Sequence, residues 1–191
     1  MKWNAAEFAP IPAEWFRGDT PNELGPGTPD KNMEALLLEA DVRTWFGGGP
    51  ADAAMAEACR AALLLRWDCL EASHRISQQN PTTTGSYWHG IMHRREPDFS
   101  NAKYWFRRVG EHPVFEQLVV EARQCAAEGP ESSLARDLAS WSEWDPFAFV
   151  DWSARCLRDP SQGADLCRQV ALLEWRLLFA YCHTAARGTA S

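Results

Sequence analysis

The sequence is poor in positive charge. Its 191 residues contain 19 Lys and Arg against 26 Asp and Glu, which gives a formal net charge of -7. A domain that serves mainly to bind nucleic acid normally carries a basic surface. The charge balance therefore argues against nucleic acid as a partner.

The sequence also lacks long apolar runs and paired cysteine motifs. No hydrophobic stretch reaches the roughly 20 residues of a membrane-spanning helix, and the N-terminus does not follow the pattern of a secretory signal. None of the six cysteines forms a C-x-x-C motif, so we expect reduced core residues. These features predict a soluble cytoplasmic protein with no membrane partner.

No segment alternates between apolar and polar residues as an exposed strand does, whereas apolar residues recur at steps of three and four. This pattern predicts an all-α fold. We expect an irregular bundle of about four longer helices plus short helices, forming one domain over residues 29–191. Residues 1–28 are rich in Pro and Gly but also in aromatic residues, which disordered tails lack. They predict an extended arm packed on the body.

Two long helices are predicted. The longer runs from Pro50 to about Gln79 and places His74 on its core-facing stripe, with Glu71 one turn earlier. The other runs from about Gln162 to Arg187 and is apolar nearly all round, which is typical of a central helix. Its two charged residues, Glu174 and Arg176, therefore need partners, and the central part of the chain offers arginines and carboxylates.

A shorter helix is predicted to begin after Ser86 as N-cap and to run from Tyr87 to about Glu96, where Pro97 ends it. Residues 82–85 are predicted to form a loop before it.

The stretch from Glu71 to Phe115 concentrates the chemistry of the chain. It holds four of the five histidines, which are His74, His89, His93 and His112. His89 and His93 are four apart, so on a helix both rings lie on one face and can share one metal ion. With His74 they predict a mononuclear site for one divalent transition metal that leaves a position open for water, with Glu71 as a base or further ligand. The alternative is that one histidine of the pair packs against Trp88 or Trp105 while the other caps the helix or faces water. His74 would then be a core histidine with Glu71 as its hydrogen-bond partner.

Arginines and aromatic residues surround these histidines. Guanidinium groups suit carboxylates and phosphates, so Arg94, Arg95 and Arg107 are candidates for binding an anionic group. The candidate walls of a pocket are Tyr87, Trp88 and Trp105. The alternatives are internal ion pairs for the arginines and a core position for the aromatic residues.

The run SYWHGIMHRREPDFSNAKYWFRRVGEHPVF, preceded by EASHRISQ, resembles the signature stretch of a family of uncharacterised bacterial and fungal proteins. The resemblance covers about Glu71 to Phe115. It implies no activity, cofactor or ligand, and none of the candidate residues above depends on it.

Two hypotheses follow from the sequence. In the first, residues 71–112 form a pocket for a small molecule, with an anionic group held by arginine and metal-dependent chemistry in which Glu71 and His74 are the catalytic residues. In the second, the protein is a non-catalytic scaffold or interaction module, and the same residues form a buried polar network.

Overall fold

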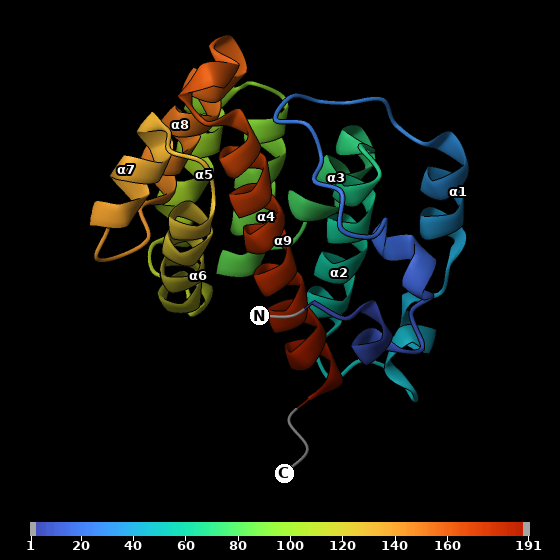
Figure 1. Cartoon of the computed structure of the whole chain (residues 1–191). Helices are drawn as coiled ribbons and strands as arrows, with labels where there is room; N and C mark the ends of the chain where they lie inside the picture. The colour runs from blue at the N-terminus through green and yellow to red at the C-terminus, as the bar shows by residue number, and fades with distance from the viewer. Residues whose placement is uncertain (1–2, 189–191) are drawn as a thin grey trace.

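A computed structural model describes residues 3–188, which form nine α-helices and four short 3-10 helices without a strand (Figure 1). The predicted all-α class is confirmed. Within this part of the chain no helix is both long and apolar enough to cross a membrane. The helices are α1 (Lys31–Glu39), α2 (Ala53–Arg66), α3 (Leu70–Ser77), α4 (Thr83–Arg95), α5 (Phe99–Val109), α6 (Val114–Glu128), α7 (Ser133–Ser140), α8 (Pro146–Arg158) and α9 (Ala164–Arg187).

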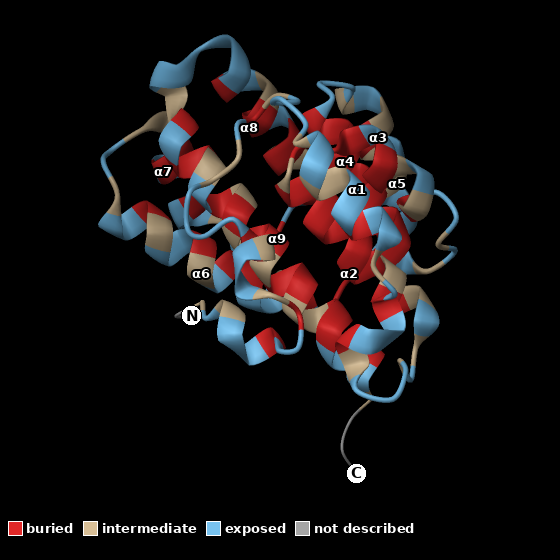
Figure 2. Ribbon diagram, turned by 90° about the vertical axis from the view of Figure 1, so that its right-hand side faces the viewer, coloured by how far each residue is buried: buried red, intermediate tan, exposed pale blue. Residues whose placement is uncertain are grey.

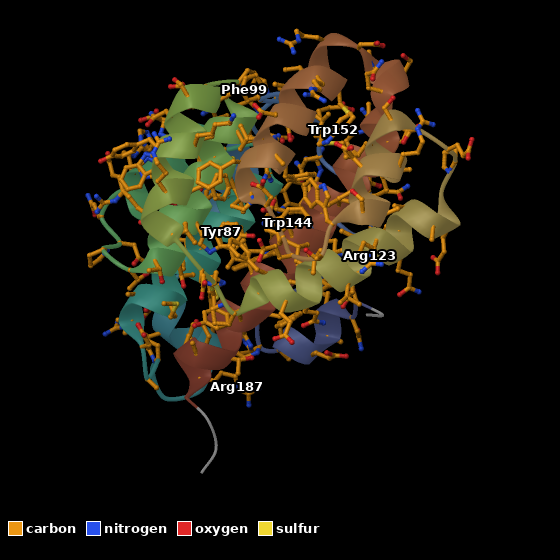
Figure 3. All side chains as sticks on the ribbon, turned by 90° about the vertical axis from the view of Figure 1, so that its left-hand side faces the viewer. Tyr87, Phe99, Arg123, Trp144, Trp152 and Arg187 are labelled. Carbon is orange, nitrogen blue, oxygen red and sulfur yellow. The ribbon has the colours of Figure 1, made fainter. Side chains whose placement is uncertain are left out.

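Helix α9 is the longest helix and packs against α2, α6, α7 and α8. Its apolar residues face several neighbours at once, which agrees with the expectation of a central helix. The buried residues of α2, α4 and α9 face one another, and exposed residues lie on the outer surfaces (Figure 2). Tyr87 and Trp144 are two of the buried aromatic residues of the core (Figure 3).

The N-terminal segment is not simply extended. It contains two 3-10 helices, Ala5–Phe8 and Ala13–Phe16, joined by turns. Its apolar side chains are part of the core, and those that are buried are Phe8, Ile11, Phe16 and Leu24. The expectation of an extended conformation was therefore wrong in detail, because short helical turns let closely spaced aromatic residues reach the same core.

The predicted single helix from Pro50 to Gln79 is wrong. The chain leaves the helix after Arg66, and Asp68 adopts a left-handed conformation with φ of 61° before α3 begins. The Asp68 carboxylate is buried and receives hydrogen bonds from Arg17 (2.8 Å), Asn22 (2.8 Å) and Arg95 (2.5 Å). These tertiary bonds outweigh the local preference for a continuous helix. The break redirects α3, which packs on α4.

Helix α4 begins earlier than predicted. Thr82 is its N-cap, with the hydroxyl accepting a hydrogen bond from the Gly85 N–H at 2.9 Å, so residues expected in a loop are helical. Gly85 packs directly on Asn80, where a Cβ atom would collide with its backbone and side chain. Every residue of α4 from Thr84 to Arg95 is buried.

A buried ion pair joins α4 to α9. Glu174 is fully buried and pairs with Arg94, and it also accepts a hydrogen bond from the Tyr87 hydroxyl at 3.0 Å. This arrangement confirms the expected partner for Glu174. Arg176 pairs instead with Asp19 in the N-terminal segment, outside the central stretch that was expected to supply its partner.

We expect Glu174→Ala to lower the free energy of unfolding by about 3–5 kcal/mol, because it leaves the Arg94 charge buried and unpaired. This loss corresponds to a decrease in melting temperature of roughly 10 °C. Glu71→Ala is the control, since it removes an exposed pair with Arg75 and should change stability by no more than about 0.5 kcal/mol. Equal melting temperatures for the two variants would contradict this role of the buried pair.

Candidate metal centre

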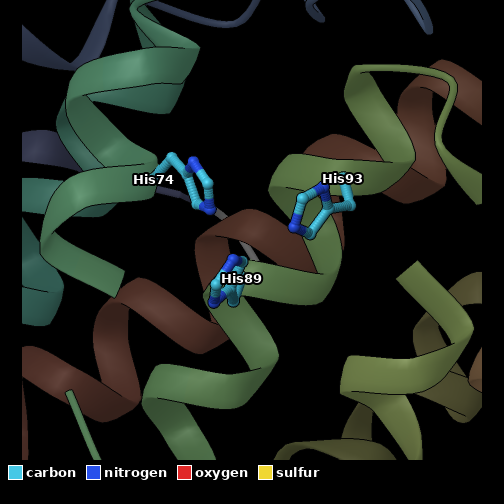
Figure 4. Close-up of side chains that lie close together, drawn as sticks. All are labelled: His74, His89 and His93. Atoms are coloured by element: carbon cyan, nitrogen blue, oxygen red, sulfur yellow. The ribbon is translucent and has the colours of Figure 1, made fainter. Parts of the chain in front are cut away.

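Three histidines converge between α3 and α4. His74 comes from α3, and His89 and His93 come from successive turns of α4 (Figure 4). One ring nitrogen from each lies within 4.8 Å of the others. In a tetrahedral zinc site with bonds of about 2.0–2.1 Å, ligand nitrogens lie about 3.3 Å apart. Small side-chain rotations would therefore bring the three nitrogens to one metal ion.

The two buried histidines of the cluster, His89 and His93, are neutral at physiological pH. His89 is 2% exposed, and burial, reinforced by the neighbouring His93 and His74, lowers its pKa to about 3. Burial also lowers the pKa of His93, although Glu96 opposes this shift. Because a neutral imidazole has a lone pair on one nitrogen, these rings are in the protonation state that metal binding requires.

His89 is the least satisfied residue of the cluster. Neither of its ring nitrogens has a hydrogen-bond partner among residues 3–188. Its ring stacks on Trp105 with centroids 3.8 Å apart, and the guanidinium of Arg108 lies over Trp105 at 5.3 Å. Trp105 therefore covers His89 from the side of α5, and Arg108 covers Trp105.

His93 has two polar neighbours. Its Nδ1 lies 3.2 Å from a carboxylate oxygen of Glu96, and its Nε2 lies 3.0 Å from the amide nitrogen of Asn101. Sequence reasoning placed Glu96 on the same helix face as His89 but missed Asn101. No local pattern identifies Asn101, because it reaches His93 only after the chain turns between α4 and α5.

Glu71 does not lie in the cluster. Its side chain is exposed and pairs with Arg75, with the closest nitrogen and oxygen 3.3 Å apart. Residues three apart on a helix differ by about 60° around its axis, and here this angle separates a half-buried His74 from an exposed Glu71. The structure therefore gives no support to Glu71 as the metal ligand or base that the sequence suggested.

The three candidate arginines also occupy different environments. Arg94 is buried in its pair with Glu174. Arg95 binds Asp68 and the carbonyl groups of Gly25 and Pro26. Only Arg107 is exposed. Both inward arginines thus have internal carboxylate partners, which was the alternative to anion binding.

Two of the three candidate wall residues are core residues. Tyr87 and Trp88 are fully buried. The Tyr87 hydroxyl binds Glu174, and the Trp88 N–H lies 3.3 Å from the sulfur of Cys182. They connect α4 to α9 and do not line an accessible pocket.

A cavity of about 460 Å³ borders the segments that carry His74 and His93. Glu71 on α3 and Glu96 at the end of α4 both line it. Carboxylates dominate its ionisable groups, and its single lysine, Lys31, pairs with Glu34. Its polar and charged lining residues are Lys31, Glu34, Asp68, Cys69, Glu71, Glu96 and Asp98.

Comparison of the sequence with models of known protein families, with curated proteins and with solved structures found no match.

The buried histidines should make stability depend on pH. Burial lowers the pKa of His89 to about 3, and that of His112 and His183 to about 4 each, from an ordinary value of 6.5. Below pH 6.5 the unfolded chain takes up protons that the folded protein does not. The free energy of unfolding should therefore decrease as the pH falls towards these folded values, by up to about 1.4 kcal/mol per pH unit for each histidine.

Urea unfolding between pH 7.5 and 5.0, with a chelator present, measures this dependence. His183→Phe should reduce the slope by about one proton, because it removes one histidine whose pKa burial lowers. Phenylalanine should suit this position, since the His183 ring packs between Phe8, Phe46 and Phe179. An identical slope in wild type and variant would show that His183 is not held neutral.

Proposed function

We propose that the protein binds one divalent transition metal ion through His74, His89 and His93 and uses it in chemistry on a small molecule. The observation that supports this proposal most directly is His89. It is a buried imidazole with both ring nitrogens unpartnered among the described residues, and two other imidazoles adjoin it.

The cost of burying ring nitrogens without hydrogen bonds favours a bound cation in the cluster. A buried polar group without a hydrogen bond costs about 1–3 kcal/mol, and such groups are rare in folded proteins. A metal ion would satisfy one nitrogen on each ring at once. Imidazole ligands suit zinc, iron, copper and nickel, so zinc is a reasonable first ion to test.

A three-histidine site leaves one coordination position open. In zinc enzymes that position binds a water molecule, whose pKa the ion lowers towards 7. His74 is half-buried and marks the side of the cluster nearest to solvent, whereas His89 and His93 are buried. We therefore propose that the open position faces the His74 side.

The neighbouring cavity indicates which small molecules to test. Its carboxylates include Glu96, which also contacts His93, so a ligand in the cavity would lie close to the metal site. The sequence favoured an anionic ligand largely because of Arg94 and Arg95. These two arginines pair with Glu174 and Asp68, so they are not free to bind such a ligand. Our proposal keeps the small molecule and favours one with a positively charged group.

The alternative function is a non-catalytic scaffold. The buried positions of Tyr87, Trp88, Arg94 and Arg95 favour it, because these residues serve the interior packing. It gives no account of His89, since a structural network would be expected to use the ring nitrogens.

We expect the purified, tag-free protein to bind close to one equivalent of zinc. The double variant His89→Ala/His93→Ala should lose this binding. His183→Phe is the matched control, because His183 is also buried with an unpartnered nitrogen but lies outside the cluster. It should bind zinc as the wild type does.

Elemental mass spectrometry and zinc titration measure these stoichiometries. Absence of stoichiometric binding of zinc, iron, copper, nickel and manganese by the wild type would refute the proposal. Loss of zinc from the His183→Phe variant would also count against it, because binding would then reflect general folding rather than the cluster.

A further inference from the structure

Glu96 forms a hydrogen bond with one ring of the histidine cluster. Nδ1 of His93 lies 3.2 Å from a carboxylate oxygen of Glu96, which is three residues further along the chain. A carboxylate only accepts hydrogen bonds, so the ring proton of neutral His93 belongs on Nδ1 and is donated to Glu96. The lone pair of the ring then belongs on Nε2.

Nε2 of His93 is free to bind a metal ion. The Asn101 amide nitrogen lies 3.0 Å from Nε2 and 3.4 Å from Nδ1. These similar distances to both ring nitrogens place the amide over the face of the ring, whereas the lone pair of Nε2 lies in the ring plane. One ring nitrogen of His93 points towards His74 and His89 (Figure 4). Since Nδ1 is bonded to Glu96, Nε2 is the atom that can complete the three-histidine set.

A hydrogen bond between Nδ1 and a carboxylate strengthens a metal bond at Nε2 in two ways. It fixes the tautomer and the orientation of the ring, and it raises the basicity of the nitrogen that binds the ion. His89 has no such support, because neither of its ring nitrogens has a hydrogen-bond partner among residues 3–188. His93 is therefore the better prepared of the two ligands that α4 supplies.

We propose that Glu96 is a positioning residue of the metal centre, which holds Nε2 of His93 towards the ion and strengthens its binding without touching it. This inference rests on the proposed function, because it concerns the affinity of the same site. The carboxylate that supports the centre is then Glu96 and not Glu71, whose side chain pairs with Arg75.

The end of α4 fixes Glu96 beside His93. Residues three apart on a helix are neighbours on its surface, and the Glu96 N–H donates to the Met92 carbonyl at 3.0 Å. The Asp98 N–H donates to the His93 carbonyl at 3.0 Å, so the chain that follows Glu96 is also bonded to this last turn. The Glu96 side chain is 35% exposed, and substitutions of it should leave the fold intact.

Zinc affinities of Glu96→Ala and Glu96→Gln test the inference. Loss of a partner that orients a metal-binding histidine typically weakens metal binding by about 10–100-fold, and we expect a loss in this range for Glu96→Ala, measured by competition with a chromophoric chelator. Glu96→Gln should lose less, because glutamine keeps a neutral acceptor for the Nδ1 proton.

Glu71→Ala is the matched control. Glu71 lines the same cavity as Glu96 and carries the same charge, but its side chain is exposed and pairs with Arg75. This variant should bind zinc as the wild type does. The metal-free Glu96→Ala protein should melt within about 2 °C of the wild type, as expected for a partly exposed side chain. A much larger decrease would assign Glu96 to the stability of the fold and overturn the inference.

The outcomes separate this inference from the proposed function. If the wild type binds zinc and Glu96→Ala binds it with equal affinity, Glu96 does not position His93 for the ion and only this inference is overturned. An equal loss of affinity in Glu96→Ala and Glu71→Ala would also overturn it, because the effect would then be one of charge in the cavity. If the wild type binds no zinc, the proposed function fails and this inference fails with it.

Nitrogen-15 NMR of the metal-free protein gives a second readout that does not depend on zinc. At neutral pH the wild type should carry the His93 proton on Nδ1. Glu96→Ala should shift the Nδ1 resonance, whereas Glu71→Ala should not. A proton on Nε2 in the wild type would overturn the inference whatever the zinc affinity, because His93 could then not donate to Glu96 through Nδ1.

Discussion

The arrangement of the candidate site depends on one buried carboxylate. Asp68 lies at the break between α2 and α3 and binds Arg17, Asn22 and Arg95. Burial alone would raise the pKa of this carboxyl group, but its hydrogen bonds with the two arginines and Asn22 outweigh burial and lower the pKa. The carboxylate therefore stays charged and joins the N-terminal segment, the break and the end of α4. Since α3 begins directly after this junction, Asp68 also determines where His74 meets His89 and His93.

The two sides of α4 serve different purposes. One side supplies the interior, where Tyr87 and Arg94 meet the buried Glu174 of α9. The other supplies His89 and His93, whose rings are both buried, and neither ring nitrogen of His89 has a hydrogen-bond partner among residues 3–188. The contacts with Glu174 join α4 to α9 on the interior side, and the histidines lie on the other side of the same helix. Metal sites depend on such support from residues that do not touch the ion.

Local spacing made part of this structure predictable. The i, i+4 relation of His89 and His93 depends only on helix geometry, and the apolar character of α9 indicated its central position. His74 was expected near the other two for a partly mistaken reason, since the continuous helix that should have carried it breaks at Asp68. The partners of Arg95, and the approach of Asn101 to His93, depend on contacts across turns. Periodicity contains no information about such contacts.

X-ray absorption spectroscopy of the zinc-loaded protein would show whether three imidazoles bind one metal ion. We expect three imidazole nitrogens at about 2.0–2.1 Å from the zinc ion, with a fourth light-atom ligand from solvent. Scattering from sulfur at about 2.3 Å, or from fewer than three imidazoles, would place the metal ion at another site and rule out the three-histidine centre.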